Sequence, residues 1–188
     1  PPESPVIRLN GLKPNQVAEK GMARTFQNIR LFQKMTVLEN VMIGRHCRTH
    51  SFIFGAILRN KSTRLEEQET IEKSYQILQK MGLEKQANDL ASNLSYGAQR
   101  RLEIGRALAT EPFLLLLDEP AAGMNPQETQ ELIKLINRLQ QEGQSILLIE
   151  HDMKLVMELS HRIFVMDYGR RIAMGTPEEI RNNPMVIK

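Results

Sequence analysis

The stretch Phe-Leu-Leu-Leu-Leu-Asp-Glu-Pro-Ala-Ala-Gly-Met-Asn, residues 113–125, decides the fold. Its first five residues are large and apolar, too few for a core helix, and they predict a strand buried on both faces, as in a parallel sheet. The strand ends at two adjacent carboxylates, Asp118 and Glu119. Because ligands of open parallel sheets bind beyond the carboxyl ends of the strands, this pair is well placed to handle Mg²⁺ and an attacking water. Taken alone, the pair is equally typical of a strand that ends in solvated charge.

The composition is that of an ordinary globular protein. A chain of 188 residues can form one sizeable core, with or without a small satellite subdomain. The net charge of +3 comes from interspersed basic and acidic residues, which is weak support for a nucleic-acid or lipid partner. Cys47 is the single cysteine, so no internal disulfide can form, and the cysteine content is compatible with a reducing compartment. No apolar run approaches the roughly 20 residues of a membrane helix.

A second buried strand is predicted at residues 145–149, and it too is followed by polar residues, among them His151. The helix between the two strands is predicted to start at the cap Asn125 and to end at Gly143. Strand–helix–strand units of this kind are almost always right-handed and parallel. We therefore expect His151 to emerge at the same sheet edge as Glu119, which favours a functional histidine over a structural one.

A third motif, Leu-Ser-Tyr-Gly-Ala-Gln at residues 94–99, predicts the start of a helix. Ser95 can cap that helix, and Leu102 and Gly105 repeat on one of its faces. Free backbone N–H groups, the serine hydroxyl and the positive end of the helix dipole together form an anion site, usually for phosphate. An ordinary capped helix is the alternative for this stretch by itself.

The remaining pattern predicts further strands and helices. Strands are expected at residues 6–9 and 24–27, a hairpin at 163–174, and helices at 15–21, from Thr36 with Glu39 as a capping box, at 62–81, at 153–160 and from Thr176. In the helix at 62–81, Ile71, Tyr75 and Leu78 are expected on one apolar face. The apolar stretch at 51–60 is expected to pack within a helical subdomain, with docking to a partner as the alternative.

In this order, the motifs resemble the ATP-binding subunits of ATP-binding-cassette (ABC) transporters from about Val6 onward. Residues 94–97 are similar to the family signature, 113–119 to the Walker B strand and 122–125 to the D-loop, while His151 matches the switch histidine and Gln27 the Q-loop glutamine. Three details stand closest to the branched-chain amino-acid importers of the Liv type: Arg-Thr-Phe-Gln-Asn-Ile-Arg-Leu-Phe at 24–32, Ala-Ala-Gly-Met-Asn-Pro at 121–126 and Ile-Glu-His-Asp-Met at 149–153.

The resemblance implies ATP and Mg²⁺ as cofactors and a role for each matching residue. Glu119 would polarise the hydrolytic water as general base, His151 would contact the γ-phosphate, and Gln27 would reach the metal and the water. Asp118 would hold the hydration shell of Mg²⁺. The further nucleotide-binding positions implied, some of them facing ATP held by an opposite subunit, are Ser95, Tyr96, Gly97, Ala98, Gln99 and Asn125. These groups suit phosphoryl transfer to water, which depends on positioning and charge stabilisation.

The resemblance also implies a P-loop NTPase-like α/β fold: a three-layer core around a mainly parallel sheet, with an inserted all-helical subdomain. Residues 1–27 would belong to the N-terminal part of the ATPase core, residues 28–92 to the helical subdomain and residues 93–188 to the RecA-like core. Two ATPase subunits would sandwich two ATP molecules, and the helical subdomain would contact transmembrane permease subunits. The location implied is the cytoplasmic face of the plasma membrane, with no nucleic-acid partner.

One part of the family pattern is missing from the sequence. No Gly-x-x-x-x-Gly-Lys-Ser/Thr occurs, whereas the family places this P-loop several dozen residues ahead of the Q-loop. Because only residues 1–26 precede Gln27, we expect a fragment without its first strands and P-loop, which alone neither binds ATP tightly nor hydrolyses it. Ala98 also replaces the usual glutamine or glutamate of the signature, which removes a polar side chain near the dimer interface.

Two other functions fit the sequence less well. A short, non-catalytic docking module of the same fold would explain the missing P-loop, but it would not need both Glu119 and His151. A nucleic-acid-directed ABC ATPase calls for a basic groove with interleaved aromatic residues, and aromatic residues make up only 5% of the chain. The resemblance implies that substrate specificity resides in other subunits of the importer.

Overall fold

A computed structural model describes residues 8–46 and 61–187, with the side chains of 61–64 left aside. The apolar stretch at 51–60 and most of the strand expected at 6–9 lie outside these residues. Within the described ranges, no helix is both long enough and apolar enough to cross a membrane.

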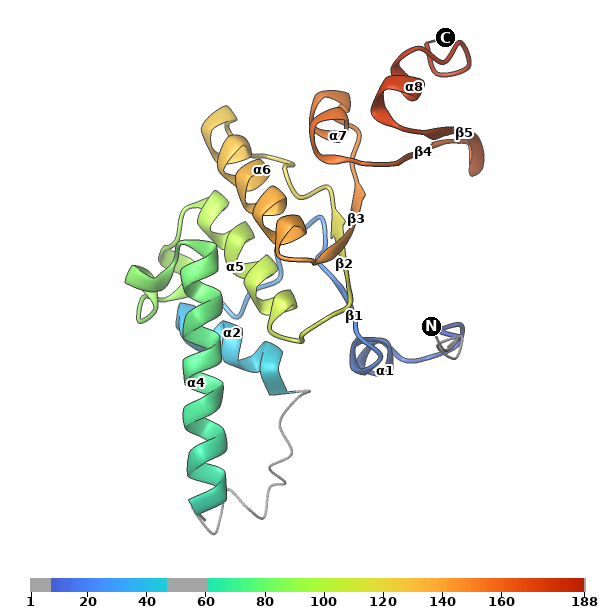
Figure 1. The fold of residues 1–188 in the computed structure, drawn as a ribbon. Coiled ribbons are helices and arrows are strands. Elements are labelled where there is room, and N and C mark those ends of the chain that lie inside the picture. Colours follow the sequence, from blue (N-terminus) through green and yellow to red (C-terminus); the bar gives the residue numbers. More distant parts are fainter. Residues whose placement is uncertain (1–7, 47–60, 188) are drawn as a thin grey trace.

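The core sheet has three parallel strands, β1 (Met22–Arg24), β2 (Leu114–Asp118) and β3 (Ser145–Ile149), in the order β1-β2-β3. Between β1 and β2 the chain forms α2 (Val37–Arg45), α4 (Lys61–Met81), two short 3₁₀ helices, η2 (Glu84–Gln86) and η3 (Ala91–Asn93), and then α5 (Tyr96–Leu108). The crossover from β2 to β3 is α6 (Pro126–Gln141). Helices α5 and α6 lie on one side of the sheet, and α2 and α4 pack beyond α5 (Figure 1). The parallel α/β architecture expected from residues 113–149 is confirmed.

The two faces of the sheet differ in burial. Leu115 and Leu117 are fully buried in the core cluster with α5 and α6, whereas the alternate residues of β2 are only half-buried. In β3, Leu147 and Ile149 are 45% and 46% exposed. The prediction that residues 113–117 form a strand buried on both faces is therefore wrong, because α5 and α6 cover one face of the sheet only. The second strand, predicted as buried, is only partly so.

The first strand ends earlier than the sequence suggests. β1 covers Met22–Arg24, and the N–H of Thr25 still donates to Leu116 O at 2.9 Å. The next two carbonyls, of Phe26 and Gln27, accept hydrogen bonds from a side chain of α5 instead of from β2. The observed strand therefore begins and ends earlier than the strand predicted at 24–27, because α5 binds the carbonyls of residues 26 and 27 that the sheet would otherwise use.

Helix α4 buries only Leu78 of the three residues predicted on its apolar face. Ile71 and Tyr75 are each 41% exposed, whereas Thr70, Ser74 and Leu78 are buried. Small side chains suit this face because α4 packs closely on its neighbours. At the contact with α5 there is no room for a larger residue than Gly105, since an added Cβ would lie 2.9 Å from Cγ of Met81 on α4. Close helix packing therefore overrides the apolar stripe at this position.

The capping box of α2 is confirmed. Thr36 Oγ1 accepts from the N–H of Glu39, and Glu39 Oε2 accepts from the N–H of Thr36 at 2.7 Å. The backbone N–H of Thr36, and then its hydroxyl, hold the pKa of Glu39 below its ordinary value.

We expect the Glu39 carboxyl to titrate below its ordinary pKa of 4.5 and to move part of the way back in Thr36→Val, which keeps the backbone donor. Since the folded-state pKa is the lower one, the box stabilises α2 above the unfolded-state pKa and loses this effect as the pH falls through the folded value. A carboxyl-detected NMR titration measures both midpoints. Identical midpoints in the two proteins would contradict the hydroxyl contribution.

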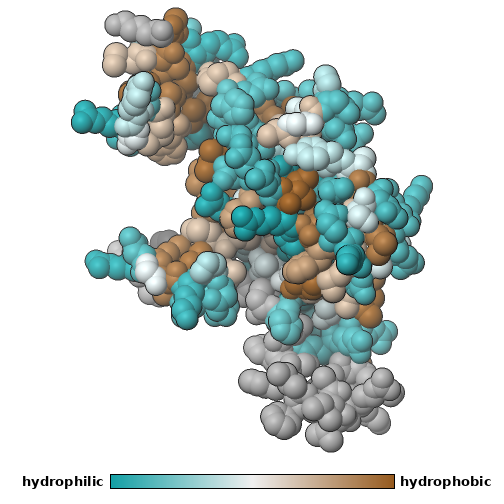
Figure 2. Space-filling model, turned by 180° about the vertical axis from the view of Figure 1, so that it is seen from behind, coloured by the Kyte–Doolittle hydropathy of each residue, from teal (hydrophilic) through white to brown (hydrophobic). Residues whose placement is uncertain are grey.

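The C-terminal part forms an outlying unit. After α7 (Met153–Leu159), β4 (Ile163–Asp167) and β5 (Arg170–Gly175) form the predicted antiparallel hairpin, and α8 (Pro177–Arg181) packs on β5. The hairpin turn places Tyr168 and Gly169 at φ 43° and 75°, as a two-residue primed turn requires. This unit has its own small core of Ile163, Ala173 and Ile180, and apolar side chains also gather on its surface (Figure 2).

Candidate functional site

Three polar side chains converge where the parallel strands end. Gln27 Nε2 donates to Glu119 Oε2 at 2.6 Å, and His151 Nδ1 lies 3.7 Å from Glu119 Oε1. The register of the sheet causes this, because Asp118 pairs with Ile149 and the N–H of Glu119 donates to Ile149 O at 2.9 Å. The prediction that His151 and Glu119 emerge side by side is confirmed, and Gln27 joins them from the segment after β1.

Glu119 occupies a strained backbone conformation. Its φ of 43° lies in the left-handed region, which a non-glycine residue adopts only where the surrounding structure imposes it. The imposing contacts are the hydrogen bond to Ile149 O and a second one from the N–H of Ala122 to Glu119 O, at 3.2 Å. The carboxylate keeps 27% of its side-chain surface exposed, and the side chain of His151 keeps 77%. A water molecule can therefore reach the Glu119 carboxylate.

Asp118 has a partner that sequence reasoning missed. Its Oδ2 lies 2.6 Å from a guanidinium nitrogen of Arg24, and the two side chains come from the paired strands β1 and β2. Arg24 in turn lies over the ring of Phe26. A cation that binds Asp118 would have to compete with Arg24. No local pattern indicates this pairing, because Arg24 and Asp118 lie 94 positions apart in the chain.

The sheet edge offers oxygen donors of the kind that Mg²⁺ prefers. Asp118 supplies a carboxylate, and Gln27 retains its amide oxygen because its nitrogen is the atom that bonds to Glu119. Among residues 8–46 and 61–187, no group of three or more His, Cys, Asp or Glu side chains could hold a metal ion. Since Mg²⁺ typically uses one or two protein carboxylates together with substrate phosphates, this sparse donor set fits Mg²⁺ bound with a nucleotide.

The signature stretch caps α5, but its amides are not free. Ser95 Oγ accepts from the N–H of Ala98 at 3.3 Å, and the N–H of Gly97 donates to Glu128 Oε1 at 3.0 Å. The prediction of free N–H groups is wrong for Gly97, because Glu128 reaches across from the start of α6, and for Ala98, because the Ser95 cap takes its N–H. A Cβ on Gly97 would lie 2.7 Å from Glu128 Oε1, so this contact depends on glycine. An anion bound here would have to displace Glu128.

The other predicted nucleotide-binding side chains bond within the protein. Tyr96 Oη donates to Ala122 O at 3.0 Å, and Gln99 Nε2 donates to Leu94 O at 3.0 Å. Asn125 Oδ1 accepts from the N–H of Glu128 at 2.9 Å and so caps α6. The signature stretch is thereby tied to the segment that follows Glu119.

The cap role of Asn125 can be measured. Asn125→Ala is expected to lower the free energy of unfolding by about 1 kcal/mol, because it removes the N-cap acceptor of α6. Asn125→Asp keeps an acceptor at the same position and is expected to leave stability nearly unchanged. Urea denaturation of both variants checks this. Equal destabilisation by the two substitutions would show that the cap is not what Asn125 contributes.

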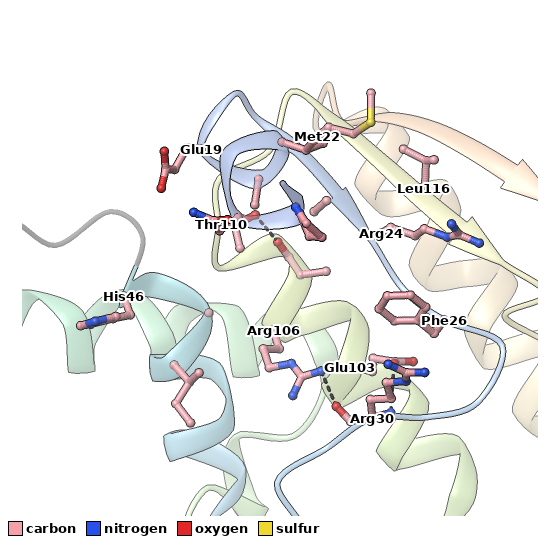
Figure 3. A pocket seen from close by; sticks show the side chains of 18 of the residues that line it. Glu19, Met22, Arg24, Phe26, Arg30, His46, Glu103, Arg106, Thr110 and Leu116 are labelled. Atoms are coloured by element: carbon pink, nitrogen blue, oxygen red, sulfur yellow. Dashed lines mark hydrogen bonds between the residues drawn. The ribbon is translucent and has the colours of Figure 1, made fainter. Parts of the chain in front are cut away.

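A large open cavity of about 1450 Å³ lies between α1 (Pro14–Glu19), β1, α2 and α5. Arg30 lies over the ring of Phe26, 4.7 Å from its centroid, and both side chains line the cavity (Figure 3). Arg106 lies over the ring of Phe32, 5.6 Å from its centroid. Burial lowers the pKa of Arg106, an effect that nearby Glu103 opposes. The cavity therefore combines apolar surface with positive charge.

This arrangement is typical of P-loop NTPase-like ATPases. It consists of a parallel sheet, of an acid, an amide and an imidazole at the carboxyl edge of that sheet, and of a capped helix beside the segment that follows Glu119. The ABC transporter family matches residues 2–122 of the chain. The sequence is 50% identical over 181 residues to LivG of Escherichia coli K12, a high-affinity branched-chain amino acid transport ATP-binding protein, covering 96% of this chain and 71% of the relative. It is 45% identical to the corresponding BraF protein of Pseudomonas aeruginosa, covering 100% and 76%.

Solved structures agree. A nucleotide-free ATP-binding cassette from an ABC transporter superposes with a TM-score of 0.77 at 32% identity, covering 96% of this chain and 72% of that one. The ADP conformation of MJ1267, an ATP-binding cassette of an ABC transporter, also gives a TM-score of 0.77, at 29% identity and with 95% of this chain and 71% of that one covered. The chain belongs to the ABC transporter family, as a member of its ATP-binding subunits.

Proposed function

We propose that this chain supplies the water-activating side chains of the ATP-hydrolysing subunit of an importer for branched-chain amino acids. The observation that carries the proposal is the convergence of Gln27, Glu119 and His151 at the carboxyl edge of the sheet. The substrate class rests on LivG and BraF, the relatives described above, which are high-affinity branched-chain amino acid transport ATP-binding proteins.

Each side chain of the sheet edge receives a role in this proposal. Glu119 accepts the proton of the attacking water, and the amide of Gln27 orients that carboxylate. His151, exposed beside Glu119, donates to the terminal phosphate. Asp118 and the Gln27 oxygen would hold Mg²⁺, for which Asp118 would have to give up its contact with Arg24. Mg²⁺–ATP supplies the phosphoryl group that is transferred and the cation that neutralises its charge.

A second ATPase subunit completes the site. The stretch from Ser95 to Gln99 lies at the start of α5, where the helix dipole favours an anion. In the proposed dimer this stretch faces the nucleotide of the other subunit, and the γ-phosphate replaces Glu128 as acceptor of the Gly97 N–H. ATP-dependent dimerisation would therefore break a hydrogen bond within each subunit and form one between them.

The cavity beside β1 is proposed as the contact with the permease. It lies next to the segment that carries Gln27, and its arginines and aromatic rings suit an amphipathic helix with an acidic residue. Docking there places the subunit peripherally at the membrane, on the cytoplasmic face in this proposal. The division into an ATPase core and a helical subdomain at 28–92 is part of the same proposal.

The test is reconstitution of the complete gene product, including any residues encoded ahead of Pro1, with its permease in liposomes. ATP-driven uptake of leucine, isoleucine or valine, with ATP hydrolysis that the permease stimulates, is the expected result. Binding to the permease without hydrolysis would favour the docking module instead. Stimulation of hydrolysis by nucleic acid and not by permease would overturn the transport function.

A further inference from the structure

The segment that carries Gln27 is held by helix side chains. Residues 26–32 have no regular secondary structure and connect β1 to the loop before α2. Backbone groups of such a segment need partners wherever they are shielded from water. Most of the partners that they find come from one face of α5, the helix that starts at Ser95.

Arg100 makes the central contacts. Its side chain is fully buried, and its guanidinium donates to Phe26 O at 2.6 Å and to Gln27 O at 2.7 Å. A third contact, from Nη1 to Glu103 Oε2 at 2.8 Å, neutralises the charge. The planar fork of arginine can hold two adjacent carbonyls at once, whereas the point charge of lysine cannot hold both in the same geometry.

Neighbouring residues on α5 extend this contact. Glu103 Oε1 accepts from the N–H of Arg30 at 3.2 Å, and Arg106 donates to Arg30 O. Arg100, Glu103 and Arg106 are spaced three residues apart, so they lie along one stripe of the helix. At the far end of the segment, Phe32 is held by Asn40 of α2 instead.

We propose that Arg100 and Glu103 are positioning residues that fix Gln27, and through it Glu119, relative to the helix that starts at Ser95. The role rests on the proposed function, because it assumes that Gln27 and Glu119 handle the hydrolytic water. A displacement of α5 is transmitted to the Gln27 backbone through side-chain hydrogen bonds. The spacing of the acid and the amide at the sheet edge therefore depends on the position of the signature helix.

Substitution of a buried ion pair can lower activity simply by destabilising the protein. The test therefore has to distinguish lost packing from a displaced Gln27. The double variant Arg100→Met/Glu103→Met removes both charges together and keeps the volume apolar, a replacement that buried ion pairs commonly tolerate. Arg100→Lys keeps the charge beside Glu103 but not the two-carbonyl fork. Arg101→Gln is the matched control, since Arg101 follows directly on α5 and pairs with Glu131 of α6.

The first readout is amide hydrogen exchange of this chain. In the double variant the Arg30 amide is expected to exchange about tenfold faster or more, the loss typical of a hydrogen bond to a charged group. The Phe32 amide, held by Asn40, should change by less than about twofold, as should both amides in Arg101→Gln. Unchanged exchange at Arg30 would show that Arg100 and Glu103 do not hold the segment at 26–32.

The second readout is ATP hydrolysis by the complete gene product. The double variant is expected to lose about tenfold or more in kcat with KM for ATP nearly unchanged, because the water-handling groups are displaced and not the nucleotide site. Arg100→Lys should fall between the double variant and the unsubstituted protein. Full kcat in the double variant would overturn the positioning role. If the unsubstituted protein hydrolyses no ATP, the proposed function fails, while the exchange result still decides whether Arg100 and Glu103 hold the segment at 26–32.

Discussion

Replacement of Glu119 by glutamine is expected to lower ATP turnover by about a hundredfold or more, the loss typical when a general base is removed. The geometry allows this substitution to test proton acceptance by Glu119 separately from the arrangement of the site. Glutamine has the same shape and keeps an oxygen for the hydrogen bond from Gln27 Nε2, so that the arrangement of the sheet edge is preserved while the proton acceptor is lost. The measurement is steady-state phosphate release by the complete gene product, with nucleotide binding measured separately.

Glu158→Gln is the matched control, because Glu158 is an exposed carboxylate on α7, outside the sheet-edge group. It should leave turnover unchanged. Nucleotide affinity should be retained in Glu119→Gln, since the carboxylate acts on water and not on the base or ribose. Turnover in Glu119→Gln equal to that of the control would remove Glu119 from the role of base.

The largest stability effect is expected for Leu117→Ala, which should lower the free energy of unfolding by roughly 2–5 kcal/mol. Leu117 is fully buried in the cluster formed with α5 and α6, in the middle of a sheet that cannot easily collapse onto the cavity. It also directly precedes Asp118 and Glu119, so loosening this strand end should disturb the site as well. Urea denaturation followed by circular dichroism gives the free energy.

Leu116→Ala provides the comparison within the same strand. Leu116 points to the opposite, half-buried face of the sheet and should cost distinctly less than Leu117, because less apolar surface returns to water. Equal losses at the two positions would show that both faces of β2 are packed alike in solution, against the burial pattern of the strand.

Much of the fold could be predicted because its signals are local. The apolar run before Asp118, the caps at Thr36, Ser95 and Asn125, and the glycine at 169 each specify a strand end, a helix start or a turn through neighbouring residues. The convergence of His151 with Glu119 was also predictable, since the handedness of the crossover leaves one sheet edge for both.

Other features depend on contacts between distant residues and could not be predicted from local pattern. The pairing of Arg24 with Asp118 and the reach of Glu128 to Gly97 join residues from separate elements. The buried face of α4 follows helix packing, which left Ile71 and Tyr75 exposed.

By itself, then, the sequence determined the order of the elements, their caps and the side chains that follow each strand, because hydrophobic period and capping chemistry act over a few residues. Only the tertiary structure decided which backbone groups those side chains bind. Arg100 illustrates the difference: nothing near it in the chain indicates that its guanidinium holds the carbonyls of Phe26 and Gln27, residues more than seventy positions away. Burial decides this, since a charge enclosed by α5 and β1 must bind whatever acceptors the fold brings to it.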